Sequence, residues 1–484
     1  MEQLQNTPPK QSTDRLDQSA SKAIALKLVI VVGLALVLLL PLTRIQKLVE
    51  ERQTRKSEVV AEVSEAWAGP MSIAGPALVI PYTIKEVNAQ NPSNYQMRHF
   101  TVLPETLNVE GEINHQPRKR SLFEVILFQA DLGLTGSYAI PEIDELLPSN
   151  TVAIHWDECF ITFSLSDQSG INASPSFTLE DTNLSFEPAA NRLVGSKMTL
   201  PMPSGASIET EGYFNKNRNL AAGFEAHIPL ELTSGQQLSF EMDLPIKGSG
   251  ELGFVPTGKE TTVSLTSDWS SPSFAGAYLP NQPETGADGF KATWNVSYLN
   301  RGFPQSANDF AQEYSLEHSL FGVRLIEPVD SYVQTSRSVK YGILIITLTF
   351  LGFFLMEVIS KRKIHPLQYI LVGVALVVFY TLLVSLSEHT TFGWSYLIAA
   401  SATIALITFY ISAVLKSARL TFTQAFGLTI VYTFIFVILR LEDYSLLAGS
   451  VGLFFVVGLL MALTRKVNWY EHLPNQNEVK NSLT

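Results

Sequence analysis

The stretch SVKYGILIITLTFLGFFLMEVISKRKIHPLQYILVGVALVVFYTLLVSLSEH, residues 338–389, decides the fold of this chain. It contains two apolar runs, 341–356 and 367–386. Each is close to the roughly 20 residues with which an α-helix crosses about 30 Å of hydrocarbon. The basic tripeptide KRK at 361–363 lies between them. Short loops rich in Lys and Arg favour the cytoplasm, so the stretch predicts a membrane hairpin with a cytoplasmic connection.

Further apolar runs extend this pattern along the chain. They lie at 24–43, 393–415, 420–440 and 445–463. With helices expected at 340–359 and 366–387, they predict an N-terminal transmembrane anchor and a five-helix transmembrane bundle over 339–464. The basic connections then fall on one side of the membrane and the acidic ones on the other. This arrangement predicts six spans, cytoplasmic termini and a large domain outside the cytoplasm.

The segments between and beyond the spans carry their own predictions. We expect a disordered cytoplasmic tail at 1–23, a stalk helix at 44–66, a connector at 306–338 and a second cytoplasmic tail at 465–484. The first tail is polar and poor in apolar residues, which is typical of disorder. The stalk is rich in helix formers and lacks Gly and Pro. Basic residues directly after the first apolar run favour an uncleaved anchor over a signal peptide.

Residues 67–305 follow a different pattern, in which turn residues recur and apolar residues alternate with polar ones. The run LSFEMDL at 238–244 is typical. Alternation of this kind predicts half-buried antiparallel strands. We therefore expect a large all-β, sandwich-like periplasmic domain, and we leave open a division into two subdomains near 170–191. The segment between the first two predicted spans, residues 44–337, carries a net charge of about −16, so the part of the chain that contains this domain is acidic.

Composition argues against several classes of protein. The formal net charge of −11 argues against nucleic acid as a partner, because phosphate contacts need Lys- and Arg-rich surfaces. Cys159 is the only cysteine, which excludes an intramolecular disulfide and a zinc site built on several cysteines. Two acids precede Cys159, so its thiol pKa should be raised rather than lowered. Without a recognisable catalytic motif, we expect no catalytic residue, no cofactor and no metal.

Long blocks of this sequence resemble the CreD family of inner-membrane proteins, also described as cell envelope integrity proteins. The blocks that carry the resemblance are KYGILIITLTFLGFFLMEV (340–358), HPLQY (365–369), LVGVALVVFYTLLVSLSEHTTFGWSY (371–396), RKRSLFEVILFQADLGLTGSY (118–138), LTSDWSSPSFAGAYLP (265–280), GFKATWNVSYLNRGFPQ (289–305) and FGVRLIEPVDSYVQTSRSVKYG (321–342). The first external block, at 118–138, is less rich in Gly than is usual for the family. The resemblance implies a role in envelope integrity, stress response and colicin tolerance, and it supplies no catalytic residues.

Candidate functional residues gather at the ends of the predicted spans. At the outer end, Ser385, Ser387, Glu388 and His389 close the second span of the hairpin. Helical spacing places Ser385 beside Glu388 and His389. One interpretation is a site that senses protons or a binding partner. The alternative is that these are ordinary polar residues at a helix end, close to the lipid headgroups. Arg440 ends a later span, and a bridge from Arg440 to Glu388 or His389 is our sharper hypothesis.

A second set of candidates lies at the cytoplasmic end of the hairpin. Glu357 precedes Lys361 by four residues, which favours an ion pair, with Arg419 or His365 as alternative partners. His365, Gln368 and Tyr369 share the first turn of the next helix. Tyr369 suits an interfacial anchor. His365 suits a loop histidine better than a metal ligand, because no further ligands follow at ligand spacing.

Two classes of function remain open from the sequence. The first is a non-enzymatic inner-membrane protein, with the lipid bilayer and unknown envelope proteins or cell-wall components as partners. The second is a transporter, channel or membrane enzyme that uses the C-terminal helices. Transport gains little support, because ionisable residues occur only at the ends of the spans. The sequence leaves a homo-oligomer open.

Overall fold

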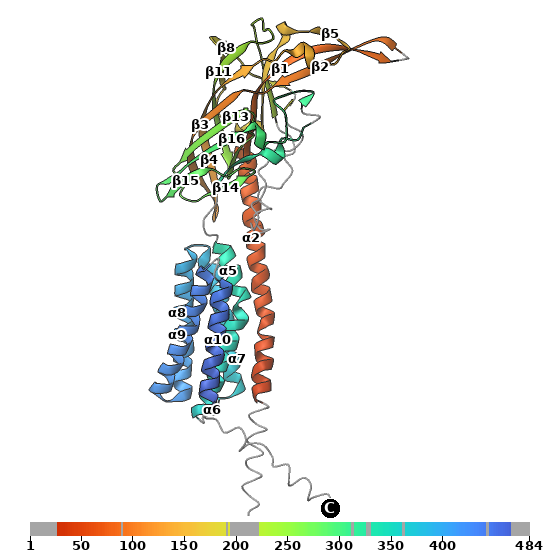
Figure 1. The fold of residues 1–484 in the computed structure, drawn as a ribbon. Helices are drawn as coiled ribbons and strands as arrows, with labels where there is room; N and C mark the ends of the chain where they lie inside the picture. The colour runs from red at the N-terminus through yellow and green to blue at the C-terminus, as the bar shows by residue number, and fades with distance from the viewer. Residues whose placement is uncertain are drawn as a thin grey trace, which may run out of the picture. The chain divides into compact units, whose positions relative to one another are not determined.

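The computed structural model describes residues 27–88, 91–189, 192–193, 222–310, 314–325, 331–360, 364–441 and 445–465. The chain divides into two compact units. We call Met1–Thr54 together with Val329–Thr484 the helix unit, and Arg55–Pro328 the β unit. One long helical stretch, Lys27–Trp67, contributes residues to both units (Figure 1).

This stretch merges two elements that the sequence analysis separates. The anchor predicted at 24–43 and the stalk predicted at 44–66 both lie within Lys27–Trp67 as far as the structure describes them. A turn at Leu38 interrupts the helix before α2 (Leu39–Trp67). The interruption lies just before Pro41, which has no N–H to donate to the preceding turn.

The other helices of the helix unit follow the predicted spans closely. They are α5 (Ser331–Lys340), α6 (Gly342–Ser360), α7 (Pro366–Ser387), α8 (Phe392–Leu415), α9 (Ala418–Arg440) and α10 (Ser445–Thr464). Within the described part of the chain, four helical stretches are long and apolar enough to cross a membrane: Lys27–Trp67, α7, α8 and α9. The pair α5 and α6, bent by 46° at Tyr341, makes a fifth if it counts as one span. The described apolar part of α10, Leu447–Leu459, is shorter, so the sixth span stays a prediction.

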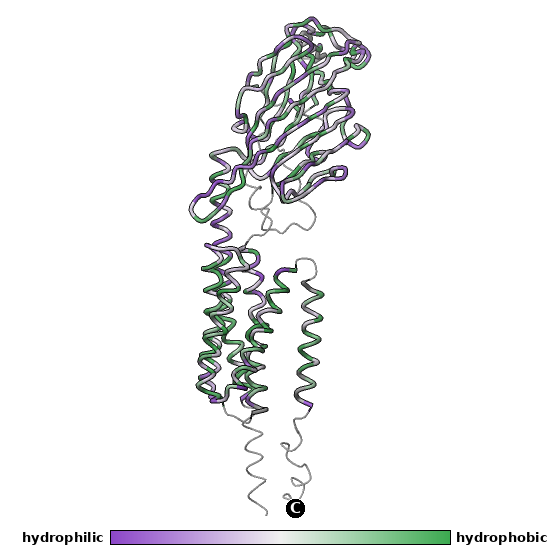
Figure 2. The backbone as a smooth tube through the Cα atoms, turned by 90° about the vertical axis from the view of Figure 1, so that its left-hand side faces the viewer, coloured by the Kyte–Doolittle hydropathy of each residue, from purple (hydrophilic) through white to green (hydrophobic). Residues whose placement is uncertain are grey.

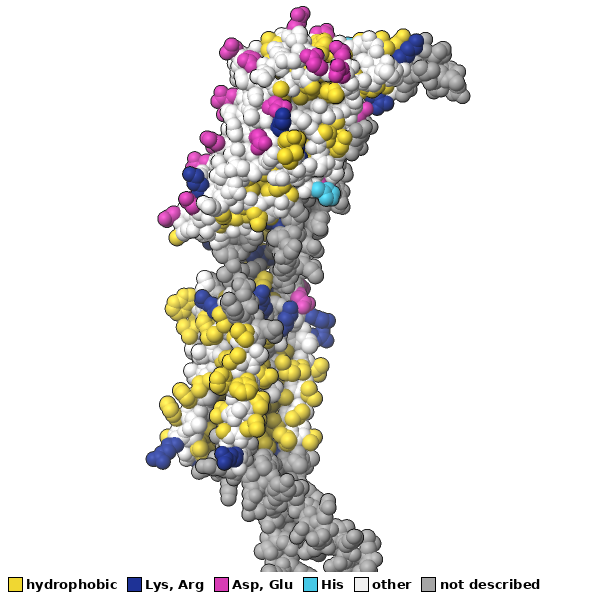
Figure 3. All heavy atoms as spheres, viewed as in Figure 1, with side chains coloured by type: hydrophobic (Ala, Val, Ile, Leu, Met, Phe, Trp, Pro, Cys, Tyr) yellow, Lys and Arg dark blue, Asp and Glu magenta, His cyan; other side chains and the backbone are white. Residues whose placement is uncertain are grey.

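The helix unit exposes apolar side chains on its surface. Phe409 is 79% exposed and Phe422 is 73% exposed, and Figure 3 shows many such side chains over these helices. Figure 2 shows mostly hydrophobic colours along these helices, with hydrophilic residues chiefly near their ends. Such a surface suits hydrocarbon, because lipid tails are as apolar as the side chains they meet. The prediction of a multi-pass α-helical membrane protein is confirmed.

The β unit contains two sheets. The first holds β1 (Met71–Asn88), β2 (Asn91–Val102), β5 (Thr151–Ile154), β6 (Phe160–Leu165), β9 (Glu187–Ala189), β10 (Ala222–His227), β12 (Glu251–Phe254), β14 (Pro272–Gly276), β17 (Ser306–Asn308) and β18 (Phe321–Leu325). The second holds β3 (Thr106–Arg120), β4 (Phe123–Ala139), β7 (Ser176–Leu179), β8 (Thr182–Leu184), β11 (Gln237–Ser249), β13 (Glu260–Ser267), β15 (Asn281–Gly286) and β16 (Gly289–Ser297). Short 3₁₀ turns, such as Trp156–Glu158 and Tyr298–Asn300, connect some of these strands.

One hydrophobic core joins the two sheets. Ile80 of β1 and Val109 of β3 belong to the same buried cluster, which makes the unit a sandwich. The alternation predicted at 238–244 is confirmed, because Leu238, Phe240, Met242 and Leu244 are all buried. The predicted large β domain is therefore confirmed in architecture.

Two details of the β unit differ from the predictions. Most strand pairs are antiparallel, but β1 pairs with β12 and β3 pairs with β13 in parallel. Both pairs join strands far apart in sequence, so no hairpin forces them to run in opposite directions. The division near 170–191 does not appear among the described residues. Phe177 and Leu179 from this region enter the common core beside β11.

The end of α2 is part of the β unit. The indole ring of Trp67 lies 4.7 Å from the Arg118 guanidinium carbon and 4.9 Å from Lys247 Nζ. Arg120 adds an ion pair with Glu62, with 2.6 Å between nitrogen and oxygen. Cation–π contacts of this kind stabilise partly buried sites. The last turns of α2 are therefore fastened to strands β3 and β11.

Candidate functional site: polar residues inside the helix unit

The first part of the candidate site lies at the C-terminal end of α7. Glu388 follows the last residue of α7, and its Oε1 lies 3.3 Å from Nε of Arg52 on α2. The Glu388 side chain is 14% exposed and that of Arg52 is 44% exposed. A charge close to hydrocarbon is costly unless it has a partner or water. Arg52 supplies this partner from a part of the chain more than 300 residues away.

The bridge predicted from Arg440 to Glu388 or His389 is not found among the described residues. The Arg440 guanidinium carbon lies 5.3 Å from the ring centroid of Phe436, one turn earlier on its own helix. Arg440 also lies close to Gly393 of α8. One guanidinium nitrogen is 2.9 Å from the position that a Cβ atom would take if Gly393 were replaced by alanine. Arg440 therefore stays beside α8 and α9, while Glu388 pairs with α2.

The predicted neighbours of Glu388 separate in the structure. Ser385 and His389 are exposed, whereas Ser387 is buried. The Ser387 hydroxyl donates to the backbone carbonyl of Leu383 at 2.7 Å, as serines inside helices often do. Of the four residues predicted at this end of α7, only Ser387 and Glu388 face other helices of the unit.

Ser387 belongs to a row of hydroxyl groups that we call the hydroxyl seam: Thr335 and Ser338 on α5, and Ser387 and Tyr380 on α7. The oxygens of Thr335 and Ser387 lie 3.3 Å apart across the two helices. Ser387 and Tyr380 are seven residues apart on α7, which places them on one face about 10 Å from each other. At the far end, the Tyr380 hydroxyl lies 3.3 Å from the point that a Cβ on Gly342 would occupy. The seam therefore runs from the end of α7 to the break between α5 and α6.

The lower half of the seam is deeply buried. Ser338 and Tyr380 each have 0% of their surface exposed. Neither hydroxyl has a hydrogen-bond partner among the described residues. Buried hydroxyls in proteins are nearly always hydrogen-bonded, because an unpaired one costs about 1–3 kcal/mol. Two unpaired hydroxyls beside a broken helix mark this place as more than a packing contact.

Gln46 of α2 adds a further polar group near the upper end of α5. Its Nε2 donates to Ser336 Oγ at 2.9 Å and to Glu50 Oε1 at 3.1 Å. Its own carbonyl oxygen is buried without a partner among the described residues. Helix α5 thus buries polar side chains toward α2 and α7 alike, including Gln334, which is 9% exposed.

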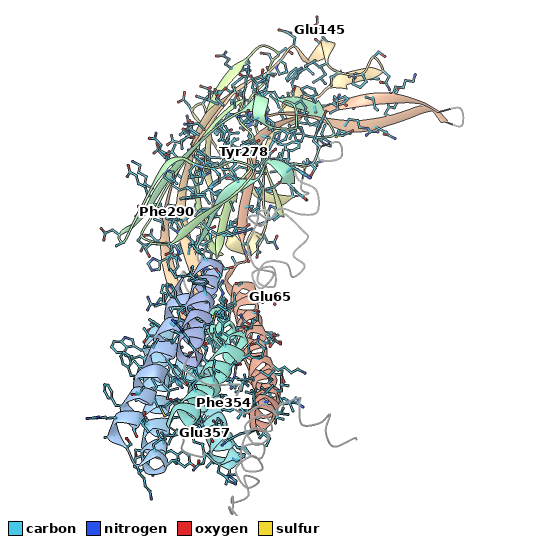
Figure 4. The ribbon with its side chains drawn as sticks, turned by 60° about the horizontal axis from the view of Figure 1, so that its bottom comes forward. Glu65, Glu145, Tyr278, Phe290, Phe354 and Glu357 are labelled. Carbon is cyan, nitrogen blue, oxygen red and sulfur yellow. The ribbon has the colours of Figure 1, made fainter. Side chains whose placement is uncertain are left out.

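A second polar group lies at the other end of the bundle, around Glu357 of α6. The Glu357 carboxylate forms an ion pair with Lys27 and accepts hydrogen bonds from the Ile364 N–H and the Tyr369 hydroxyl, both at 3.2 Å. Lys27 Nζ also donates to the Ile364 carbonyl. Figure 4 shows Glu357 beside Phe354 on α6. The predicted partner Lys361 lies outside the described residues, and the structure assigns Glu357 to Lys27 instead of Arg419 or His365.

His365 and Gln368 have a structural role at the start of α7. His365 Nδ1 accepts from the Leu367 N–H at 3.2 Å, and Gln368 Oε1 accepts from the His365 N–H at 3.0 Å. This reciprocal pattern is a capping box, which satisfies backbone donors that the first turn leaves free. Pro366 follows at the first helical position, where no N–H is needed. These contacts agree with the interpretation of His365 as a loop histidine.

The two predicted groups of site residues do not meet. Glu357, His365, Gln368 and Tyr369 lie near the start of α7, whereas Ser387 and Glu388 lie at its end. The 22 residues of α7 span about 33 Å, which is close to the hydrocarbon thickness of a bilayer. Each group therefore belongs to a different face of the membrane region.

Cys159 of the β unit is buried and poorly suited to act as a nucleophile. Burial, together with the nearby charge of Asp157, raises the pKa of the Cys159 thiol to about 12, so the thiolate is scarce at neutral pH. Among the residues that the structure describes, no three His, Cys, Asp or Glu side chains are arranged to hold a metal ion. The aromatic residues near the C-terminal end of the unit pack against each other, as Phe274 does on Trp294 at 5.7 Å between centroids.

Two leucines of the β unit are strongly exposed. Leu279 is 70% exposed and Leu299 is 77% exposed, although most of this acidic unit presents polar side chains. The Tyr278 hydroxyl donates to the Asn300 carbonyl at 2.8 Å, which holds the two loops together. Figure 4 shows Tyr278 within the unit. Apolar side chains that gather on a protein surface can mark an interaction site.

The sequence comparisons cover nearly the whole of both units. The family described as "Inner membrane protein CreD" matches residues 23–470. Inner membrane protein CreD of Escherichia coli strain K12 is 31% identical over 446 residues, which cover 90% of this chain and 92% of that protein. This chain belongs to the CreD family. CreD membership, together with the apolar helices, identifies it as an inner-membrane protein.

Comparison with solved structures adds no argument about the CreD fold. A crystal structure of an M1 zinc metallopeptidase from Deinococcus radiodurans covers 40% of this chain and 38% of its own, with 11% identity and a TM-score of 0.19. A two-domain M1 zinc metallopeptidase bound to L-arginine is similar to the same extent, with a TM-score of 0.19. Neither likeness is close enough to transfer a fold or an activity.

Several site residues of this CreD chain escaped the sequence analysis. They are Lys27, Gln46, Arg52, Thr335, Ser336, Ser338 and Tyr380. One signal was available, since 334–336 and 338 place four polar residues directly before an apolar run. The partners Lys27 and Arg52 carried no such signal, because ion pairs over 300 residues apart are created by helix packing alone.

Proposed function

We propose that this CreD family protein supports cell envelope integrity under stress without catalysing a reaction. In this proposal the β unit faces the periplasm and binds an envelope protein or cell-wall component. Membership of the CreD family and location in the inner membrane support a role at the cell envelope. The observation that carries the binding role is the exposure of Leu279 and Leu299, the most exposed large apolar side chains among the described residues of this acidic unit.

The proposed orientation rests on the charges of the connections. Lys416 and Arg419 lie at the connection between α8 and α9, on the same end of the bundle as Lys27, whereas Glu388 lies at the opposite end. Short loops rich in Lys and Arg favour the cytoplasm. We therefore place both termini in the cytoplasm. Reporter fusions after Leu230 and near Lys363 test this, with a periplasmic signal expected from the first and a cytoplasmic one from the second.

The binding role can be tested with charge substitutions at the exposed leucines. Cells that lack the protein are complemented with the Leu279→Glu/Leu299→Glu variant and exposed to a detergent that challenges the envelope. We expect the variant to accumulate in the membrane but to lose most of the protection that the native chain gives. The loss follows because a carboxylate at the centre of an apolar contact must be desolvated.

A matched control separates binding from added charge. Asn281 is exposed on β15 close to Leu279, so Asn281→Glu adds one carboxylate beside the leucines, half the charge that the double variant adds. We expect it to complement fully. Full protection by the double leucine variant would refute a binding role for this surface. Protection that instead depends on residues of the hydroxyl seam would favour a function of the helix bundle, as a transporter, channel or membrane enzyme.

A further inference from the structure

We propose that the hydroxyl seam is a hydrated site that holds water or another small uncharged hydrogen-bonding molecule at the break between α5 and α6. This inference goes beyond the proposed binding role of the β unit and does not depend on it. It rests on the geometry of Thr335, Ser338, Tyr380 and Ser387.

The upper half of the seam lacks a hydrogen-bond donor. The Thr335 hydroxyl donates to the Ser331 carbonyl at 2.7 Å, and the Ser387 hydroxyl donates to the Leu383 carbonyl at the same distance. Each hydroxyl has only one hydrogen. The two oxygens, 3.3 Å apart, therefore face each other mainly as acceptors. A molecule that donates hydrogen bonds completes this arrangement.

The lower half of the seam offers free donors and acceptors. The hydroxyls of Ser338 and Tyr380 are fully buried and have no partner among the described residues. Ser338 lies in the last turn of α5, just before the break, and the Tyr380 hydroxyl lies 3.3 Å from the Cβ position of Gly342, the first residue after it. Polar groups at membrane depth need a partner, because hydrocarbon provides none. Irregular helices with buried polar groups are where membrane proteins bind polar solutes.

The chemistry of the seam selects an uncharged ligand. Its four side chains are hydroxyls, which donate and accept but carry no charge. Glu388, directly after Ser387, is already paired with Arg52. An ion that entered the seam would lose its hydration without meeting an opposite charge, which is costly. Water, or a small molecule with hydroxyl or amide groups, meets no such cost.

Cysteine accessibility in the full-length protein tests this proposal directly. Cys159 is buried and is the only cysteine, so a Cys159→Ala background leaves no native thiol. Ser338→Cys is then compared with Ile346→Cys, because Ile346 of α6 is also 0% exposed but faces apolar neighbours. The probe is iodoacetamide, which is uncharged and water-soluble. Alkylation requires a thiolate, and a thiolate forms only where water reaches it.

We expect Ser338→Cys to react at least about tenfold faster than Ile346→Cys in detergent and in membranes, since only the first thiol is hydrated. Equal and slow reaction of the two variants would overturn the proposal. If Ser338→Cys does not fold, Thr335→Cys takes its place in the same comparison. Protection of the thiol by molar glycerol, as the probe solute, would identify a site for a polyol, and reaction without protection would identify water.

Thermal unfolding gives a second, independent result. The Tyr396 hydroxyl donates to the Tyr432 carbonyl at 2.8 Å, so Tyr396→Phe removes a hydrogen bond and lowers Tm. We expect Tyr380→Phe to lower Tm as well, because its hydroxyl bonds to water in the seam. If the Tyr380 hydroxyl had no partner at all, Tyr380→Phe would instead raise Tm, because an unpaired buried hydroxyl destabilises the folded protein. An unchanged or raised Tm for Tyr380→Phe would therefore contradict the proposal.

Discussion

The two units of this chain place their polar and apolar groups in opposite ways. The β unit encloses an apolar core between two sheets and exposes acidic side chains, whereas the helix unit exposes many apolar ones (Figure 3). In the helix unit Phe409 and Phe422 are exposed, and Ser338 and Tyr380 are buried. The difference reflects the solvent of each unit. Water stabilises exposed charge on the β unit, and hydrocarbon tolerates only apolar side chains around the helices.

Ion pairs follow the same division. The β unit buries the pair Arg324 and Glu251, which are 3% and 1% exposed at their side chains. The helix unit keeps Lys27–Glu357 and Arg52–Glu388 at its two ends, where headgroups and water are within reach. Both helix-unit pairs connect α2 or the turns that precede it to the C-terminal helices. They fasten the N-terminal stretch to the bundle.

The largest effect that we expect comes from the core of the β unit. Trp294 is 0% exposed and packs on Phe274 and Phe321, so Trp294→Ala should destabilise the β unit by about 3–5 kcal/mol. Chemical unfolding of the full chain in detergent, followed through the β-sheet circular dichroism signal, measures this loss. Leu279 is 70% exposed, so Leu279→Ala should change the free energy of unfolding of the β unit by less than about 0.5 kcal/mol. Similar losses in both variants would contradict the sandwich core.

A smaller effect should come from the ion pair at the Lys27 end. Lys27→Met leaves the Glu357 carboxylate, which is 13% exposed, without its cation. We expect a loss of about 1–3 kcal/mol in the stability of the helix unit, below the value for fully buried pairs because some water remains. Thermal unfolding in lipid nanodiscs measures it. The Lys27→Met/Glu357→Gln variant should recover part of the loss, and a fully stable Lys27→Met protein would show that this pair is not formed.

The smallest effect should separate Arg52 from Arg440. Arg52→Ala removes the partner of Glu388, and we expect a cost of about 0.5–1 kcal/mol because Arg52 is largely exposed. Arg440 has no ion pair among the described residues and lies over the Phe436 ring, so Arg440→Ala should cost less than about 0.5 kcal/mol. The same thermal unfolding measurement compares them. A larger loss of stability in Arg440→Ala than in Arg52→Ala would instead support the bridge from Arg440 that the sequence predicts.

The local elements of both units could be predicted because their patterns are local. Runs of about 20 apolar residues predicted α7, α8 and α9 nearly to the residue, and strict alternation predicted β11 with its buried face. Pro366 and the capping residues His365 and Gln368 marked the start of α7. The candidate site was less accessible, because helical spacing grouped Ser385 and His389 with Glu388 although only Glu388 meets another helix.

The sequence alone therefore determined that this chain enters a membrane repeatedly, carries one acidic sheet-rich unit and belongs to the CreD family. Apolar length, alternation and long shared blocks are properties of neighbouring residues, so they are readable without coordinates. The tertiary structure alone decided that Arg52 pairs with Glu388, that Lys27 pairs with Glu357, and that β3 runs parallel to β13. It also brought the hydroxyls of α5 and α7 together, because contacts between distant segments depend on how helices and sheets pack.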